Sequence, residues 1–331
     1  MLYCKKGATR DAVIEHFDDH EINGVGKEMA SGTIVWYKYQ HDYSMDYLTF
    51  KSKEDGTTFK FSGSSSSNLL QYSLDDGANW TVLTHNTNSP AVASGDSIMF
   101  KAIALTIDST KGIGQFSSTG EFGAEGNVMS LLFGDGFIGQ TSLAGKASAF
   151  TYLFSACTGL TTAENLSLPA TTLDYRCYWY MFRGCTSLTT APELPATTLA
   201  YYCYSHMFDG CTSLTTAPEL PATTLAKACY HYMFYNCTSL TTAPELPATT
   251  LADWCYYFMF RGCTSLNYVK CLASSGMTSD SCLSTWLASV ASSGTFVKSP
   301  NATTGDTAWD SQWRLNNSSG IPSGWTVVDA S

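Results

Sequence analysis

The sequence of 331 residues lacks any apolar run of roughly 18 residues, so no segment predicts a membrane-spanning helix. Its first residues lack an apolar stretch of about seven and a small-residue cleavage site, so no secretory signal peptide is expected. Lys and Arg do not cluster, and the formal net charge is −10. The sequence therefore predicts neither membrane insertion nor binding to nucleic acid, which requires basic side chains against phosphates.

Catalytic motifs are missing as well. The sequence contains no GxSxG, no HExxH and no phosphate-binding glycine loop, which predicts a non-enzymatic protein without a cofactor. Glu193, Glu219 and Glu245 recur at one repeat position, and such a column resembles the carboxylate pair of a glycoside hydrolase. The three residues share one environment and have no partner acid of different character, so a solvated acidic ladder is favoured.

The twelve cysteines do not show metal-binding spacing, because no CxxC occurs and histidines do not accompany them. Eleven lie within or beside a repeat, and eight of these recur at two fixed positions of the 26-residue unit. Stacked repeats would place equivalent cysteines about 5 Å apart with parallel Cβ vectors, which favours buried free thiols over disulfides. His16 and His20 stand beside acidic residues in a predicted helix, where a solvated acidic helix is favoured over a metal site.

The sequence does contain a repeat. Three nearly identical units of 26 residues span 185–262, each opening with CTSLTTAPELPATTL and closing with MF and two further residues, and a looser unit spans 157–184. Within a unit, apolar residues step by four (Leu199, Cys203, Met207, Cys211), which predicts a helix of about three turns. Thr212 to Ala217 predicts a short strand that ends at a proline.

The repeat motif MFxGCTSLTTAPELPATTL resembles the BspA-like leucine-rich repeats of gut Bacteroidetes and of the bacteriophages that infect them. GIGQFSSTGEFGAEGNVMSLLFGDGF and GTFVKSP…GIPSGWTVVD resemble the caps that accompany those repeats. The resemblance covers roughly residues 46–331. The expected fold class is mixed α/β: a leucine-rich-repeat solenoid of short strand plus helix with a 26-residue period, in which stacked units share one core.

Five segments are expected along the chain. They are an N-terminal docking arm (1–45), a small antiparallel β domain (46–106), the N-terminal cap of the solenoid (107–156), the repeat units (157–262) and the C-terminal cap (263–331). The arm contains the predicted helix 11–22 and a strand at 33–39. In the N-terminal cap, FTYLF (150–154) is in register with the YxYMF positions of the first unit. In the C-terminal cap, strands are predicted at 267–273, 294–298 and 324–328, and a helix at 280–290. In the β domain, Asp55-Gly56 and Asp76-Gly77 predict the turns of two hairpins. The acidic Asp75-Asp76 pair is expected to serve the turn and not to bind calcium.

Comparison of the units with one another indicates a binding surface. Most repeat positions are identical, whereas five positions on the predicted helix vary. Ten of the twenty residues at these free positions are Tyr, Trp or Phe, interspersed with Arg, His and Asp, a composition typical of recognition surfaces. The predicted binding residues are Tyr175, Arg176, Trp179, Tyr180, Arg183, Tyr201, Tyr202, His206, His231, Tyr232, Tyr235, Trp254, Tyr257, Phe258 and Arg261. Packing between neighbouring helices or subunits is the competing interpretation.

The resemblance implies a phage virion protein, such as a fibre or capsid-decoration protein, that attaches to a host cell-surface protein or polysaccharide. The absence of a signal peptide favours this hypothesis over a bacterial cell-surface adhesin, which is the first alternative. A hydrolase acting on glycans is the weaker alternative. The expected location is the virion, assembled in the host cytoplasm, with other virion proteins bound through the N-terminal arm; a homo-oligomer is compatible with the sequence.

Overall fold

The computed structural model describes most of the chain, in two compact units, Met1–Asp46 and Tyr47–Ser331. The described residues are 2–5, 27–31, 34–39, 42–277, 279–301 and 320–331.

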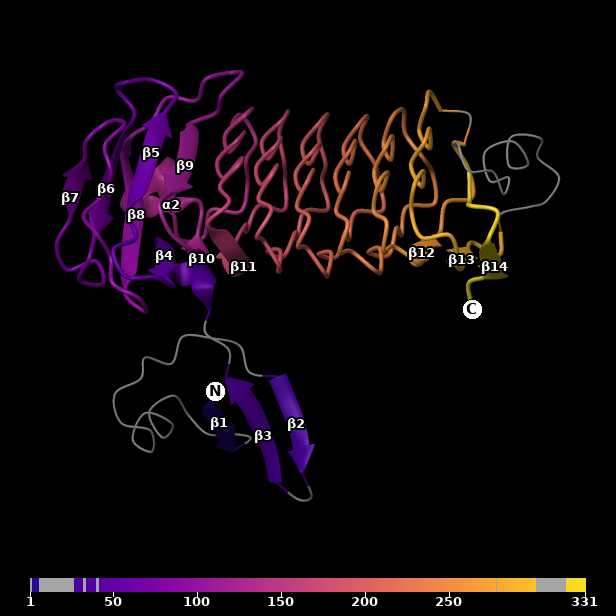
Figure 1. Ribbon diagram of the computed structural model, residues 1–331, viewed down its shortest axis with the longest axis horizontal. Coiled ribbons are helices and arrows are strands. Elements are labelled where there is room, and N and C mark those ends of the chain that lie inside the picture. The colour runs from indigo at the N-terminus through magenta and orange to yellow at the C-terminus, as the bar shows by residue number, and fades with distance from the viewer. Residues whose placement is uncertain (1, 6–26, 32–33, 40–41, 278, 302–319) are drawn as a thin grey trace. The chain divides into compact units, whose positions relative to one another are not determined.

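The first unit contains a three-stranded antiparallel sheet. In it, β3 (Ile34–Tyr39) lies between β1 (Leu2–Lys5) and β2 (Lys27–Ser31) (Figure 1). The strand predicted at 33–39 is confirmed by β3. The predicted helix at 11–22, with its two histidines, lies outside the described residues.

A short 3-10 helix, η1 (Tyr43–Met45), lies at the end of the first unit. The second unit begins with a six-stranded sheet of order β11-β10-β4-β8-β6-β7. Its strands are β4 (Leu48–Ser52), β6 (Leu69–Ser73), β7 (Thr81–Leu83), β8 (Ser97–Ala104), β10 (Phe122–Asn127) and β11 (Leu160–Ser167). Neighbouring strands are antiparallel, except that β10 and β11 are parallel. The sheet therefore continues past the boundary expected at residue 106 and into the first repeat unit.

One of the two predicted hairpins is confirmed and the other is wrong. β6 pairs with β7 across the Asp76-Gly77 turn, as predicted. β4 does not pair with the next strand, β5 (Phe59–Gly63), because β5 forms a separate two-stranded sheet with β9 (Gly114–Ser118). The two strands meet through their side chains instead: the rings of Phe50 and Phe59 lie 5.2 Å apart in a buried phenylalanine core. β4 and β5 therefore contact each other through aromatic packing between two sheets and not through backbone hydrogen bonds within one sheet.

After β11 the chain winds into a stack of coils (Figure 1). The predicted fold class, an α/β leucine-rich-repeat solenoid, is wrong. Among the described residues the one α-helix is α2 (Ser130–Phe133), which is followed by the 3-10 helix η2 (Gly134–Gly136) and lies outside the repeats. None of the predicted repeat helices forms, and the regular structure of the protein is mostly β.

Consecutive turns occupy the place of each predicted helix. Every fourth residue has a left-handed backbone, with φ of 54° at Arg176, 58° at Tyr180 and 71° at Gly184. The N–H of Met181 donates to the carbonyl of Tyr178, three residues earlier, whereas the N–H of Tyr178 donates to Cys203 in the next coil. Successive N–H groups therefore alternate along this segment. One donates to a carbonyl in its own turn, and the next donates to a carbonyl in the neighbouring coil. A series of four-residue turns repeats its apolar positions every four residues, and the sequence pattern does not distinguish it from a helix.

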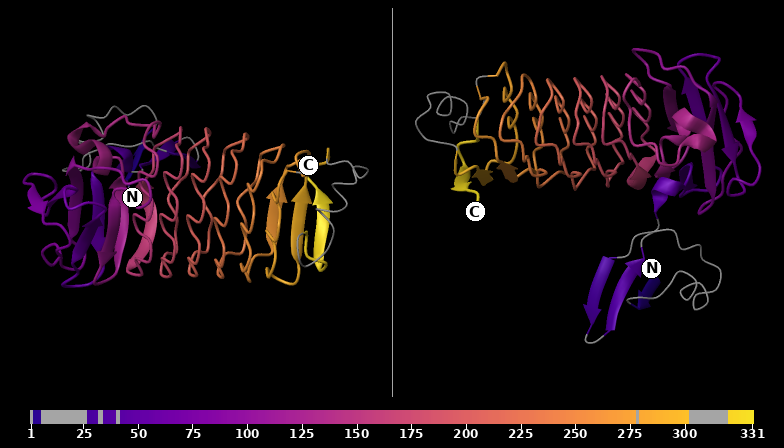
Figure 2. Two further views of the ribbon diagram at one scale, coloured as in Figure 1. Left: turned by 90° about the horizontal axis from the view of Figure 1, so that it is seen from above. Right: turned by 180° about the vertical axis from the view of Figure 1, so that it is seen from behind.

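In place of the predicted repeat strands, the 26-residue units form isolated parallel β-bridges, such as the one between Thr190 and Thr216. Prolines follow closely in each unit and have no N–H to extend a ladder. Longer strands appear at the two ends of the repeat array: β11 lies in the first unit, and three more strands follow the last unit. There β12 (Tyr268–Cys271), β13 (Gly294–Lys298) and β14 (Trp325–Asp329) form a parallel sheet at the end of the stack (Figure 2), and all three were predicted as strands.

The helix predicted at 280–290 is wrong, since this segment also consists of turns, with positive φ at Ser281, Thr285 and Ser289. On the other side of the repeats, residues 150–154 are in register with the units, as predicted, because the N–H of Phe150 donates to the carbonyl of Cys177. That segment is likewise a series of turns and not a helix.

Two aromatic ladders and two cysteine columns fill the inside of the stack. One ladder contains Phe154, Phe182, Phe208, Phe234 and Phe260, with successive ring centroids 5.4 to 5.6 Å apart. The other contains Phe150, Tyr178, Tyr204, Tyr230 and Tyr256, at 5.6 to 6.1 Å. All cysteines of the second unit are buried free thiols, as predicted.

Candidate binding face on the coil stack

The turns of each coil point two residues inward and the next two outward. Cys177 and Tyr178 are buried, Trp179 and Tyr180 are partly exposed, and Met181 and the residue after it are buried again. The free positions of the repeat therefore fall on the outer side of the coils, and two of their twenty residues, Ser205 and Ala228, are buried. The other eighteen are here called the aromatic face: Tyr175, Arg176, Trp179, Tyr180, Arg183, Tyr201, Tyr202, His206, Asp209, Lys227, His231, Tyr232, Tyr235, Asp253, Trp254, Tyr257, Phe258 and Arg261.

A ladder of stacked rings runs along this face from coil to coil. Tyr180, His206, Tyr232 and Phe258 hold the same repeat position, and their successive ring centroids lie 4.4, 4.5 and 4.7 Å apart. Tyr152 extends the ladder at 5.0 Å from Tyr180. The sequence interpretation omitted Tyr152, although its place in the motif FTYLF, in register with the units, is the signal that would have included it. The rings form one continuous apolar strip.

A second group of rings surrounds His231. Its ring stacks on that of Tyr257 at 5.1 Å and meets Tyr202 at 5.7 Å and Trp254 at 6.4 Å. Burial, together with the nearby His206, lowers the pKa of His231 from its ordinary 6.5 to about 3. Burial and a hydrogen bond with the Tyr201 side chain raise the pKa of Tyr202 to about 12. At neutral pH both rings are therefore uncharged, and this part of the face is apolar.

Charged groups are interleaved with the rings. Asp209 accepts hydrogen bonds from Arg183 Nε at 3.3 Å and from His206 Nδ1 at 3.0 Å, and Lys227 Nζ lies 3.7 Å from Asp253. The Arg183–Asp209 pair and the Lys227–Asp253 pair each join two adjacent units. The sequence interpretation named neither carboxylate as a site residue, although each stands at a free position. Their role is to fix cationic side chains beside the rings.

The side chains of Ser205 and His231 lie close enough to resemble a catalytic nucleophile and its general base. Ser205 Oγ lies 3.3 Å from His231 Nδ1. Ser205 is, however, fully buried, with 0% of its surface exposed, and the carboxylate of Asp209 contacts His206 and not His231. A substrate has no access to this hydroxyl, and the base lacks an orienting acid. The pair serves packing between two coils.

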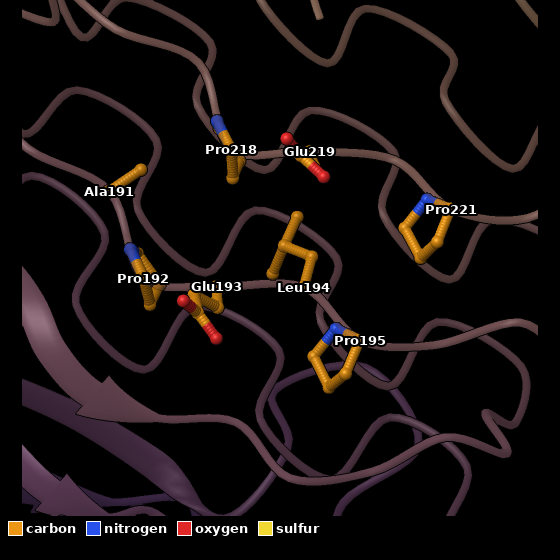
Figure 3. Close-up of a pocket in the computed structure, with 8 residues that line it drawn as sticks. All are labelled: Ala191, Pro192, Glu193, Leu194, Pro195, Pro218, Glu219 and Pro221. Atoms are coloured by element: carbon orange, nitrogen blue, oxygen red, sulfur yellow. The ribbon is translucent and has the colours of Figure 1, made fainter. Parts of the chain in front are cut away.

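The glutamate column lies on a different part of the coils. Glu193 and Glu219 line a groove of about 260 Å³ together with Pro192, Pro195 and Pro218 and neighbouring apolar residues (Figure 3). Glu193, Glu219 and Glu245 are exposed. Glu245 also binds Lys270 Nζ at 2.9 Å. All three glutamates are thus exposed to solvent, and none lies in the buried apolar environment that would distinguish the acid from the base in glycoside hydrolysis.

The described part of the chain contains no cluster of three or more His, Cys, Asp or Glu side chains arranged to hold a metal ion. Nor does any helix in that part have the length and hydropathy to cross a membrane. The Asp75 carboxylate accepts hydrogen bonds from Ser73 and from the backbone and side chain of Asn79, which is turn chemistry, as predicted. Comparisons with models of protein families, with curated proteins and with solved structures found no match.

Proposed function

We propose that this protein is a non-enzymatic attachment protein of a bacteriophage particle, as a fibre or capsid decoration, and that the aromatic face binds the host cell surface. The observation that carries the proposal is the continuity of the face. Its rings contact one another across four successive units while remaining partly exposed, and Tyr201 keeps 37% of its surface accessible. Aromatic side chains supply large contact areas at a low cost in conformational entropy.

The phage assignment rests on the motif resemblance described above, which applies equally to a cell-surface adhesin carrying the same face. In the phage hypothesis the N-terminal unit, residues 1–46, joins the protein to other virion proteins. Labelling this protein on intact phage particles and on bacterial cells distinguishes the two locations. A label confined to bacterial envelopes would replace the virion proposal with the adhesin.

Attachment is tested with a variant that removes four rings and keeps the inward-facing residues. Trp179, Tyr180, Trp254 and Tyr257 are replaced by Ser, and a control variant replaces the exposed threonines 197, 198, 223 and 224 by Ser. Because each anchor at an interface contributes about 2 kcal/mol or more, we expect the first variant to lose over about a hundredfold in affinity for gut Bacteroidetes envelopes. The control should bind like wild type.

Circular dichroism checks that both variants are folded, and Tyr201→Ser alone supplies a milder variant if the quadruple one unfolds. Equal binding by a folded quadruple variant would assign the rings to packing and would refute attachment through this face.

A further inference from the structure

The aromatic face carries a charge opposite in sign to that of the chain. It holds four cationic and two carboxylate side chains, a net charge of +2, in a chain whose net charge is −10. Exposed charges act over about 8 Å at physiological ionic strength, so a ligand at the face responds to these local groups and not to the net charge of the chain. An anionic ligand is repelled by most of the surface and attracted to this face.

Two of the four cations have no carboxylate partner among the residues that the structure describes. Arg183 and Lys227 are paired with Asp209 and Asp253, as described above. No ion pair within the described ranges involves Arg176 or Arg261. These two arginines belong to the first and the last of the four units, so they mark the two ends of the face.

Aromatic rings hold both unpaired guanidinium groups in place. The guanidinium carbon of Arg176 lies 4.2 Å from the ring centroid of Trp179, 4.9 Å from that of Tyr175 and 5.5 Å from that of Tyr202. That of Arg261 lies 4.8 Å from the ring of Phe258. Arg176 Nε is buried and has no hydrogen-bond partner in the described part of the chain, so a ligand reaches this guanidinium through its two terminal nitrogens. A planar carboxylate binds such a stacked guanidinium through two parallel hydrogen bonds.

We infer that the ligand of the aromatic face is an acidic polysaccharide, that is, a linear chain of sugars bearing carboxylates. This inference rests on the proposed attachment function and names its ligand class. Each such sugar presents an apolar C–H face, which covers aromatic rings, and a carboxylate, which pairs with a guanidinium. A linear polymer also matches a face that repeats at the spacing of stacked backbone, about 4.8 Å per coil.

An acidic peptide fits the face less well. It supplies carboxylates for Arg176 and Arg261 but no rigid apolar ring to cover the ten aromatic side chains of the face. A neutral polysaccharide has the opposite defect, since it covers the rings and leaves two guanidinium groups without anionic partners.

The test uses the full chain and polymers whose charge is removed without changing the sugar backbone. Polygalacturonate, alginate and hyaluronan are each compared with their methyl esters, and polyglutamate represents an acidic peptide. The double variant Arg176→Gln, Arg261→Gln removes the two unpaired charges. Lys51→Gln, Lys53→Gln removes the same charge from exposed positions on the β domain and serves as the control.

We expect at least one carboxylated polysaccharide to bind at least tenfold more tightly than its ester, with affinity that falls as salt rises from about 50 to 300 mM. The arginine variant should lose at least tenfold and the lysine control less than twofold. Equal binding of acid and ester, unchanged binding by the arginine variant, or no binding to any acidic polysaccharide would overturn the inference. Polyglutamate binding as tightly as the best polysaccharide would assign an acidic protein as the ligand instead.

Failure of this inference is distinguishable from failure of the attachment proposal. If the quadruple Ser variant loses attachment to envelopes while the arginine variant keeps it, attachment through the face stands and the acidic ligand is refuted. If wild-type protein does not attach at all, the proposed function itself fails.

Discussion

The rings of Phe182 and Phe208 stack almost parallel, with 3° between their planes and 5.4 Å between their centroids. Both rings are fully buried, and Phe208 stacks in turn on Phe234 at 5.5 Å. Each ring therefore forms part of the contact between its own coil and both neighbouring coils. Removing one ring leaves a gap that the adjacent backbones cannot close, because hydrogen bonds fix the distance between coils.

Phe208→Ala should lower the free energy of unfolding by about 3 to 5 kcal/mol, through lost burial and the remaining cavity. Chemical denaturation measures the change, and Thr197→Ala at an exposed position of the same unit serves as control. Since each unit contacts only its neighbours, hydrogen exchange should show the first loss of protection in the adjacent coils. Unchanged stability would show that the inward residues of the turns are wrongly assigned.

The cysteines should be inert in the folded protein. Burial raises the pKa of Cys203 and of Cys263 to about 12, and Cys185 Sγ donates a hydrogen bond to the carbonyl of Phe154. Alkylation at neutral pH should therefore leave the cysteines of residues 47–331 unmodified, whereas alkylation in denaturant without reductant should modify all twelve. Mass spectrometry counts the labels. A stoichiometric disulfide between neighbouring coils would contradict this expectation.

Ala156→Gly should stabilise the protein. Ala156 has φ of 55°, and the equivalent residues Gly184, Gly210 and Gly262 show the residue that this conformation favours. A left-handed alanine costs about 1 to 2 kcal/mol, and glycine gives back about 0.5 to 1 kcal/mol through unfolded-state entropy, so the gain should reach about 1 kcal/mol. Exposed Ala144, which lacks a positive φ, is the control: its change to Gly should destabilise. Thermal unfolding compares the two variants.

His231 should make stability depend on pH. Its pKa lies near 3 in the folded protein because of burial and the nearby His206, compared with an ordinary 6.5. Between pH 3 and 6.5 the unfolded chain binds more protons at this residue than the folded protein, so stability falls as pH falls through this window. The slope from this group is at most about 1.4 kcal/mol per pH unit.

His231→Gln should flatten the pH profile between pH 6.5 and 4 relative to wild type, as measured by chemical denaturation in matched buffers. His85→Gln, in a turn of the β domain, provides the comparison. Identical profiles for wild type and His231→Gln would show that His231 is solvated in the folded protein.

The sequence predicted that the invariant Cys, Met and Phe positions of a unit point inward, because they recur every four residues, and that the variable positions point outward. This is confirmed except at Ser205 and Ala228, which are buried. The sequence predicted the wrong backbone for these positions. The residues that set the local structure are non-glycine residues with positive φ, such as Tyr180 and His206, and nothing in their identity indicates a left-handed conformation. A four-residue step was therefore assigned to a helix, although alternate N–H groups donate to another coil.

The two predicted hairpins of the β domain also show that local sequence chemistry does not determine which strands pair. The turn at Asp76-Gly77 predicted its hairpin from local chemistry, and β6 and β7 do pair. The turn at Asp55-Gly56 has the same chemistry, but β5 pairs with β9, 55 residues further along the chain. That choice depends on the phenylalanine core between the two sheets, which involves residues distant in sequence. The ion pairs Arg183–Asp209 and Lys227–Asp253, which join neighbouring units, also depend on stacking between units.

The alternating hydrogen bonds of the coils make the length of the protein adjustable. N–H groups in the turns of one coil donate to carbonyl groups of the coil that follows, and these bonds between turns recur at every junction between units. A gain or loss of 26 residues therefore creates no new type of contact, and both ends of the stack keep their existing partners. Each added unit would also add free positions to the aromatic face. For the proposed attachment function, duplication would therefore lengthen the stack and increase the number of contacts with a polymeric ligand at the same time.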